Sequence, residues 1–268
     1  MTGHRTNLDH FLAWDFGRYL QVYRTMVEDE FPWEAKLTLT LALIRPPATT
    51  SIAAQLGQTG DLTEQALTRI VQTSLSISEL VRYGFDHDRG RDAVRQITAT
   101  WCDVPHSAQI YVLASATLVP LRWMERYGWR RPTAREREAT YQFHARLAEA
   151  MAIPYFPDCL GDLADAFDNY EMDHLRPSTH AATVEHATRR LIRAVIGRPL
   201  TPILNILAGT IHDPPMRAAA HLPRPTWPIR AGLHAALRAH ASWRRLARPR
   251  TQTAATSAST SSSSTPNT

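Results

Sequence analysis

The sequence contains very little cysteine. Only two occur among 268 residues, Cys102 and Cys159, which are too few and too far apart for a disulfide framework or a cysteine-based zinc site. Such sparse use of cysteine fits a reducing compartment. No stretch near the N-terminus combines a basic head with a long apolar run, so the sequence predicts no secretory signal. We therefore expect a cytoplasmic protein.

Long apolar runs and several common site motifs are also absent. The longest runs, 37–44 and 110–118, fall short of the roughly 18–20 residues that a membrane span needs. The sequence has no Gly-rich phosphate loop, no dinucleotide fingerprint, no Gly-x-Ser-x-Gly elbow and no His-Glu-x-x-His zinc helix. With 44% hydrophobic and 21% charged residues, its composition is that of an ordinary globular protein. Composition alone does not identify a function.

Acidic residues are missing from the C-terminal part of the chain. After Asp213 there is no Asp or Glu but there are eight arginines, so this segment carries +8 while residues 1–213 carry −3. The simplest interpretation is a solvated helix that docks on the body of the protein. The alternative is peripheral contact with an anionic membrane surface. Nucleic acid is not expected as a partner, because aromatic side chains are sparse among these arginines and no known binding motif occurs.

The hydrophobic pattern is helical from residue 8 to residue 247. Apolar residues recur at three- and four-residue steps, and no sustained period-two alternation occurs. Proline and glycine separate the expected helices, which span 8–27, 33–44, 51–56, 63–83, 89–102, 106–127, 133–152, 157–173, 178–197 and proline-punctuated stretches up to 247. Thr133 and Glu136 have the spacing of a capping box. The last helix is expected to bury an apolar face that carries Leu233, Leu237, Trp243 and Leu246.

These patterns predict an all-α fold with a single multi-helix domain over residues 8–250. Residues 251–268 are almost wholly Thr, Ser and Ala. Such a segment cannot bury enough surface to offset its ordering entropy, so the sequence predicts a disordered tail.

Two features of these helices bear on chemistry. His144 lies mid-helix among aromatic and apolar neighbours, where a hydrogen-bonded core histidine is the simplest interpretation. A buried imidazole can also ligate a metal or move a proton near neutral pH. Glu171 and His174 form one Glu-x-x-His step, whereas di-iron bundles need two such steps and two more glutamates. Surface capping or salt bridging is therefore the favoured role for this step.

Segments spread over residues 15–230 occur in the order typical of a known family. They include FPWEAKL (31–37), LALIR (41–45), ELVRYGFD (79–86), RGR (89–91), YVL (111–113) and PLRWMERYGWR (120–130). This series resembles the MpaB-type oxygenases, which include the mycophenolic-acid side-chain oxygenase and the latex-clearing rubber oxygenases. The resemblance implies an all-helical haem-b fold in which a helix histidine ligates the iron and dioxygen oxidises or cleaves an alkene. It also implies that Arg45 lies near the haem propionates or the pocket.

On this basis we expect an oxygenase-like oxidoreductase that acts on a hydrophobic isoprenoid or polyketide substrate in secondary metabolism. An apolar cavity between helices would accept such a small hydrophobic molecule. If haem is absent, the same pocket would serve cyclisation or isomerisation, or bind lipophilic ligands without catalysis.

The sequence departs from the family pattern at the iron ligand. Counting without gaps from Phe85, the expected histidine falls at Trp101, and an indole has no lone pair for iron. The sequence therefore predicts weak haem binding or none. Three residues remain open as replacement ligands: His144, His106 and Cys102. Trp101 is expected to be buried on the apolar stripe of its helix and to fill the pocket.

Overall fold

The computed structural model describes residues 17–58, 62–177, 214–219 and 224–247, with isolated positions 179, 182, 183 and 186. Every element within these residues is helical, and no strand occurs among them. The predicted all-α fold is therefore confirmed. The predicted tail at 251–268 and almost all of the helix predicted at 178–197 lie outside the described residues.

The N-terminal half begins with a helical segment over residues 17–25 that passes into a π-helical turn, η1 (Met26–Glu30). Helix α2 (Pro32–Ile44), the 3-10 turn η2 (Pro46–Ala48) and helix α3 (Thr50–Gln58) follow. Pro32 occupies the first position of α2, where its missing N–H would be unpaired in any case. The helical path thus continues beyond the end that was predicted near residue 27.

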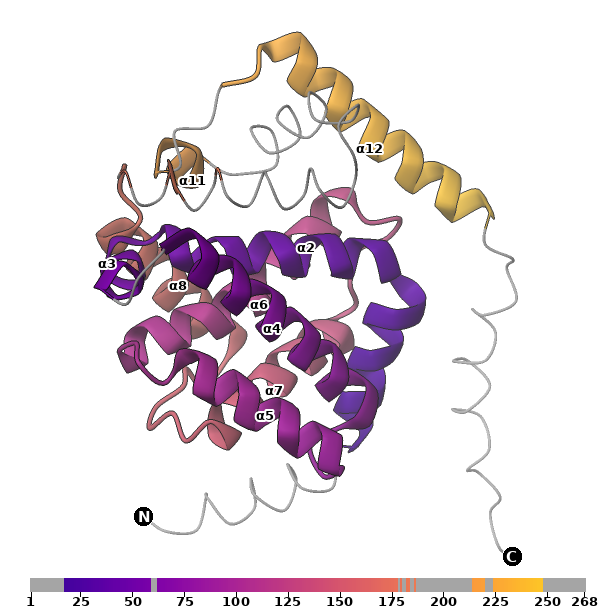
Figure 1. Ribbon diagram of the computed structural model, residues 1–268. Coiled ribbons are helices and arrows are strands. Elements are labelled where there is room, and N and C mark those ends of the chain that lie inside the picture. The colour runs from indigo at the N-terminus through magenta and orange to yellow at the C-terminus, as the bar shows by residue number, and fades with distance from the viewer. Residues whose placement is uncertain are drawn as a thin grey trace, which may run out of the picture.

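Helix α6 (His106–Tyr127) is the central element of the bundle and packs against α2, α7 (Ala134–Ala150) and α8 (Leu160–His174). Helices α4 (Leu62–Tyr83) and α5 (Asp88–Trp101) pair along one side, and α2 crosses above them (Figure 1). Helix α6 continues through Pro120. The largest fully buried apolar side chains between these helices include Phe31, Leu43, Leu80, Ile97, Leu113 and Phe143.

Glycine fixes the turn between α4 and α5. Gly84 has φ +79°, which L side chains rarely adopt, and it closes α4 as predicted. A Cβ atom on Gly90 would lie 1.6 Å from the carbonyl oxygen of Gly84. The start of α5 can approach Gly84 this closely because Gly90 has no side chain, whereas Gly84 is needed for the backbone conformation of the turn.

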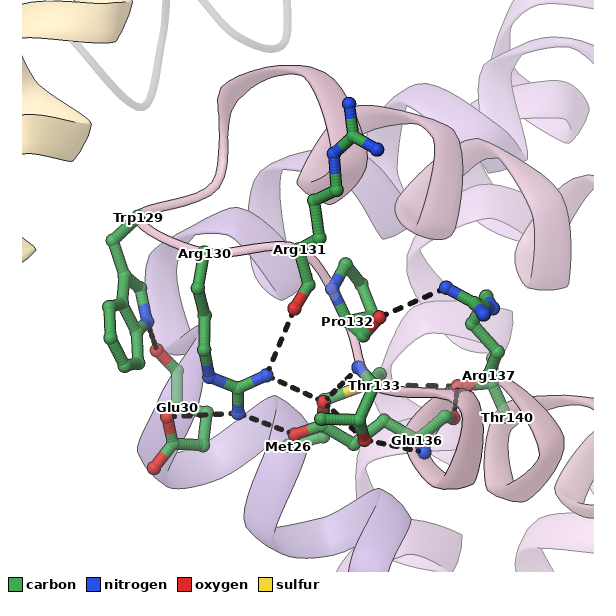
Figure 2. A network of polar contacts seen from close by, with 10 residues as sticks. All are labelled: Met26, Glu30, Trp129, Arg130, Arg131, Pro132, Thr133, Glu136, Arg137 and Thr140. Carbon is green, nitrogen blue, oxygen red and sulfur yellow. Dashed lines mark hydrogen bonds and ion pairs between the residues drawn. The ribbon is translucent and has the colours of Figure 1, made fainter. Parts of the chain in front are cut away.

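A polar network holds the loop between α6 and α7 against η1 (Figure 2). The Trp129 indole donates to the Glu30 carbonyl at 3.0 Å, and Arg130 reaches the Glu136 carboxylate at 2.6 Å. Thr133 and Glu136 form the predicted capping box, with Thr133 N–H donating to Glu136 Oε2 at 2.7 Å. This network fixes where α7 begins, and therefore where the side chains on α7 point.

Helices α11 (Pro214–Ala219) and α12 (Trp227–Ala247) complete the described structure, and α12 lies on the outside of the bundle (Figure 1). Its inner side contacts α6 and α2. The Tyr127 hydroxyl lies 2.6 Å from His234 Nδ1, and Arg244 pairs with Glu34 at 3.1 Å. No helix in the described residues is long and apolar enough to cross a bilayer.

Of the four α12 side chains that were predicted to be buried, two are partly buried and two are exposed. Leu233 and Leu237 are partly buried, and Leu237 packs against the small cluster formed by α2 and α6. Trp243 and Leu246 are 64% and 85% exposed. A helix turns about 100° per residue, so these two side chains project away from the side that Leu233 and Leu237 occupy.

Candidate functional site

Arg45 forms a buried ion pair with Glu171. Arg45 lies at the end of α2 and Glu171 on α8, and their side chains are only 5% and 8% exposed. The guanidinium donates from Nε and Nη2 to the carboxylate at 2.6–2.9 Å, which is a bidentate arrangement. The Tyr111 hydroxyl of α6 donates to Glu171 Oε1 at 2.7 Å. This cluster therefore ties α2, α6 and α8 together and confirms salt bridging as the role of Glu171.

Aromatic rings enclose this polar cluster. Tyr111 is stacked on Phe167 and on Tyr170, with ring centroids 5.2 and 4.4 Å apart. Burial raises the pKa of the Tyr111 hydroxyl well above its ordinary value, so the phenol stays protonated and can donate to Glu171. The Tyr170 hydroxyl forms a separate hydrogen bond with Ser51 Oγ of α3 at 2.6 Å. The ion pair and its hydroxyl donor are thus buried among aromatic rings, where a satisfied polar network is held rigidly.

Trp101 is fully buried at the C-terminal end of α5, as the sequence predicted. Its indole Nε1–H donates to Thr73 Oγ1 of α4 at 2.9 Å. The Arg69 guanidinium lies 5.8 Å from the ring centroid. The indole therefore acts as a hydrogen-bond donor and a packing group. It presents no lone pair to a metal.

His144 is fully buried in the middle of α7. Its Nδ1 lies 2.9 Å from the carbonyl oxygen of Thr140, one helical turn earlier. Because a carbonyl only accepts, Nδ1 carries the hydrogen and Nε2 bears the lone pair. Nε2 is buried and has no hydrogen-bond partner within the described structure.

The surroundings of His144 are aromatic. The rings of Tyr23 and Phe143 lie 5.9 and 5.1 Å from the imidazole, both edge to face. Burial lowers the pKa of His144 to about 4. The imidazole is therefore neutral at physiological pH, with one bound proton and one unused lone pair.

The other two proposed ligands lie at the surface. Cys102 is exposed, and its thiol donates weakly to the Ala99 carbonyl at 3.3 Å. His106 is exposed as the first residue of α6. No group of three or more His, Cys, Asp or Glu side chains that could hold a metal ion occurs in the described part of the chain.

The structure does not gather the predicted site residues in one place. Gln109 in the first turn of α6 donates to the Trp101 carbonyl at 3.0 Å, and Tyr111 of the next turn reaches Glu171. Arg45 and Trp101 thus lie around the same end of α6. His144 lies elsewhere, because its neighbour Phe143 contacts Phe85, which precedes α5. Trp101 ends α5, whose 14 residues span about 20 Å.

Comparison with known proteins identifies the family. Residues 35–248 match the profile described as "ER-bound oxygenase mpaB/B'/Rubber oxygenase, catalytic domain", which covers most of the chain. The chain belongs to this family. The matched range falls inside the single domain predicted for residues 8–250. No curated protein matches the chain significantly.

Sequence reasoning did not find the partners of the site residues. Glu171 was noted for its spacing to His174, and nothing local pointed to Arg45, 126 positions away. Thr73, 28 positions before Trp101, supplies the hydroxyl oxygen that accepts from the Trp101 indole. No local signal marked that pairing.

Proposed function

We propose that this protein is an oxygenase of the MpaB and rubber-oxygenase family that uses haem b held by His144. Its substrate would be a hydrophobic isoprenoid or polyketide chain of secondary metabolism. The observation that supports the proposal most directly is the buried, unpartnered Nε2 of His144. Family membership supplies the oxygenase chemistry, and this nitrogen supplies a ligand where Trp101 cannot.

An unused lone pair in a core is costly. Leaving a buried acceptor unsatisfied costs about 1–3 kcal/mol, whereas an apolar side chain of similar size would avoid that cost. Iron ligation accounts for this cost, because it uses the same lone pair. The protonation state fits as well, since a ligating imidazole must be neutral and burial holds the pKa of His144 near 4.

The hydrogen bond from Nδ1 also fits a ligand. Metal-binding histidines generally donate their second ring nitrogen to a carbonyl or carboxylate, which fixes the tautomer and the ring orientation. In this chain the Thr140 carbonyl accepts that bond at 2.9 Å. The Thr140 hydroxyl in turn donates to the Glu136 carbonyl at 2.8 Å, inside the network that anchors the start of α7 (Figure 2). Haem, when bound, would supply the activation of dioxygen.

Arg45 has a different role in this proposal. Its guanidinium is already engaged by the Glu171 carboxylate, which Tyr111 also contacts. A haem propionate or a substrate carboxylate would have to compete with a buried bidentate ion pair. We therefore assign Arg45 the positioning of α8 against α2, in place of the anion-holding role that the resemblance implied.

The absorption spectrum of the full-length protein, expressed with a haem precursor, tests the proposal. The sequence predicted weak haem binding or none because Trp101 replaces the expected ligand. The buried, unpartnered Nε2 of His144 leads us to expect instead a Soret band in the wild type, which should disappear in His144→Leu. His106→Ala and Cys102→Ser serve as controls and should retain the band, because both residues are exposed. Melting temperatures show whether each variant is folded. A stoichiometric band in a folded His144→Leu variant would refute the assignment of the ligand.

One observation favours a second candidate. Trp101 fills the ligand position expected from the family, and its indole is already hydrogen-bonded to Thr73. A haem-free descendant would then cyclise or isomerise a polyene or polyketide, or bind it without turnover. A purified wild-type protein that shows no Soret band after haem reconstitution would favour this candidate. Analysis of the polyene or polyketide after incubation with the protein would then separate its two forms, because a cyclase or isomerase converts the compound and a binding protein leaves it unchanged.

A further inference from the structure

The side of α12 that faces away from the bundle is uncharged. We define this outer face by six residues of α12: Gly232, Ala235, Ala239, Ser242, Trp243 and Leu246. At 100° per residue, each of them points within about 50° of the mean direction of the six around the helix axis. All six are exposed, with Trp243 at 64% and Leu246 at 85%. A solvated surface helix normally places charged and polar residues on this side. The outer face of α12 is therefore unusual for a helix that meets only water.

One arginine without an acidic partner lies beside this face. At 100° per residue, Arg238 lies about 90° from the mean direction of the outer face, at its edge. It is exposed, and no ion pair involves it within the described part of the chain. Arg230 lies about 170° from that direction and shares the docked side with Leu233 and Leu237. The chain also contains no acidic residue after Asp213.

The inner side of α12 is already occupied, which fixes the orientation of the helix. Tyr127 and His234 stack with ring centroids 5.5 Å apart, and Arg244 is bound to the buried Glu34. The Arg245 Nε–H donates to the Trp129 carbonyl at 2.9 Å. These contacts hold α12 on the outside of the bundle (Figure 1), and the residues of the outer face are exposed.

We propose that the outer face of α12 binds the surface of an anionic lipid membrane. Trp243 and Leu246 would enter the boundary between headgroups and acyl chains, and the small residues between them would let the helix lie close to that boundary. Arg238 would extend along the edge of the helix to lipid phosphates. This inference rests on α12 alone and does not depend on haem or on the proposed reaction.

Charge favours a membrane over a second copy of the chain. In a two-fold contact between outer faces, Arg238 of each copy would lie at the contact with no acidic residue on α12 to neutralise it. An anionic membrane supplies the opposite charge along the whole helix. We therefore commit to lipid and treat self-association as an outcome of the test.

Vesicle sedimentation with the full-length protein tests the proposal. We expect binding to phosphatidylcholine vesicles that contain phosphatidylserine, much weaker binding to phosphatidylcholine alone, and release at high salt. Arg238→Gln should lower partitioning about fivefold. Trp243→Ser with Leu246→Ser should lower it about tenfold or more. Both variants change exposed residues, so their melting temperatures should match the wild type.

A matched control lies on α4. Leu75 is 63% exposed and Arg82 is exposed, so Leu75→Ser with Arg82→Gln removes the same kinds of side chain from another helix. This control should bind like the wild type. Brominated lipids should quench tryptophan fluorescence in the wild type and less so in Trp243→Phe, which retains binding.

Three results would overturn the proposal. The first is the absence of binding to phosphatidylserine vesicles. The second is equal loss of binding in the α4 control. The third is a wild-type dimer in light scattering that becomes monomeric in Trp243→Ser with Leu246→Ser, which would assign the outer face to a second copy of the chain.

Discussion

Truncating Trp101 provides a direct test of its packing role. The side chain is fully buried between α5 and α4, and its indole donates to Thr73 Oγ1 at 2.9 Å. Trp101→Ala removes the whole ring and leaves a void that the surrounding helices fill only partly. Such substitutions cost about 3–5 kcal/mol of unfolding free energy. We expect a value in the upper half of this range, because Thr73 is itself buried and loses its donor.

Two milder substitutions separate volume from hydrogen bonding. Trp101→Phe keeps most of the ring volume but removes the Nε1–H, so it should cost about 1–2 kcal/mol. Trp101→His should fall between the Phe and Ala variants, because it retains part of a ring. In the hydrogen-bonding partner, Thr73→Val should cost about 1–3 kcal/mol, since it leaves the buried indole donor unpaired.

Urea denaturation of these variants measures the differences. Trp243→Ala is the matched control, because that indole is 64% exposed and its loss should change stability by less than about 0.5 kcal/mol. Values this small for both Trp101→Ala and Trp101→His would refute the packing role. They would also remove the basis for placing Trp101 in the pocket that the family uses.

Two further predictions concern buried titratable groups. Glu171→Ala leaves the buried Arg45 guanidinium without its carboxylate and should cost about 3–5 kcal/mol in urea unfolding, whereas Tyr111→Phe removes one hydrogen bond and should cost about 1 kcal/mol. His144 has a pKa of about 4 when folded, below its ordinary value of 6.5, so the unfolded chain takes up a proton first as the pH falls. Its contribution to stability is therefore complete above about pH 6.5 and declines by about 3 kcal/mol toward pH 4. Unfolding free energies of the haem-free protein across this range, compared with His144→Leu, should differ by that amount; equal pH dependence would contradict it.

The helix boundaries could be predicted because local chemistry determines them. Gly84 ends α4 through a backbone conformation that only glycine adopts readily, and Thr133 with Glu136 starts α7 through two reciprocal hydrogen bonds. Each signal lies within four residues of the boundary that it sets. The start of α8 was less well placed. Its N-cap is Cys159, whose sulfur accepts from the Asp162 N–H, and cysteine is not a residue that usually marks a helix start.

The orientation of α12 was predicted incorrectly because apolar character was taken as evidence of burial. Leu233 and Leu237 are four residues apart and share a side of the helix. Trp243 and Leu246 follow Leu237 by six and nine residues, which turns them well away from that side. Their exposure of 64% and 85% is therefore what the spacing requires, once the side that docks on the bundle is known.

The partners of the buried polar groups could not be predicted from the sequence. Arg45 and Glu171 pair across 126 positions, and Trp101 and Thr73 across 28. Local spacing carries no information about such pairs, because they depend on how whole helices pack. The cost of an unpaired buried charge means that Arg45 must have a partner, but several acidic residues could have supplied it. For His144 the same reasoning gives the opposite result: packing leaves Nε2 without any partner from the described residues. An apolar side chain would have avoided that loss, so the retained imidazole is the strongest argument in this chain for a ligand from outside it.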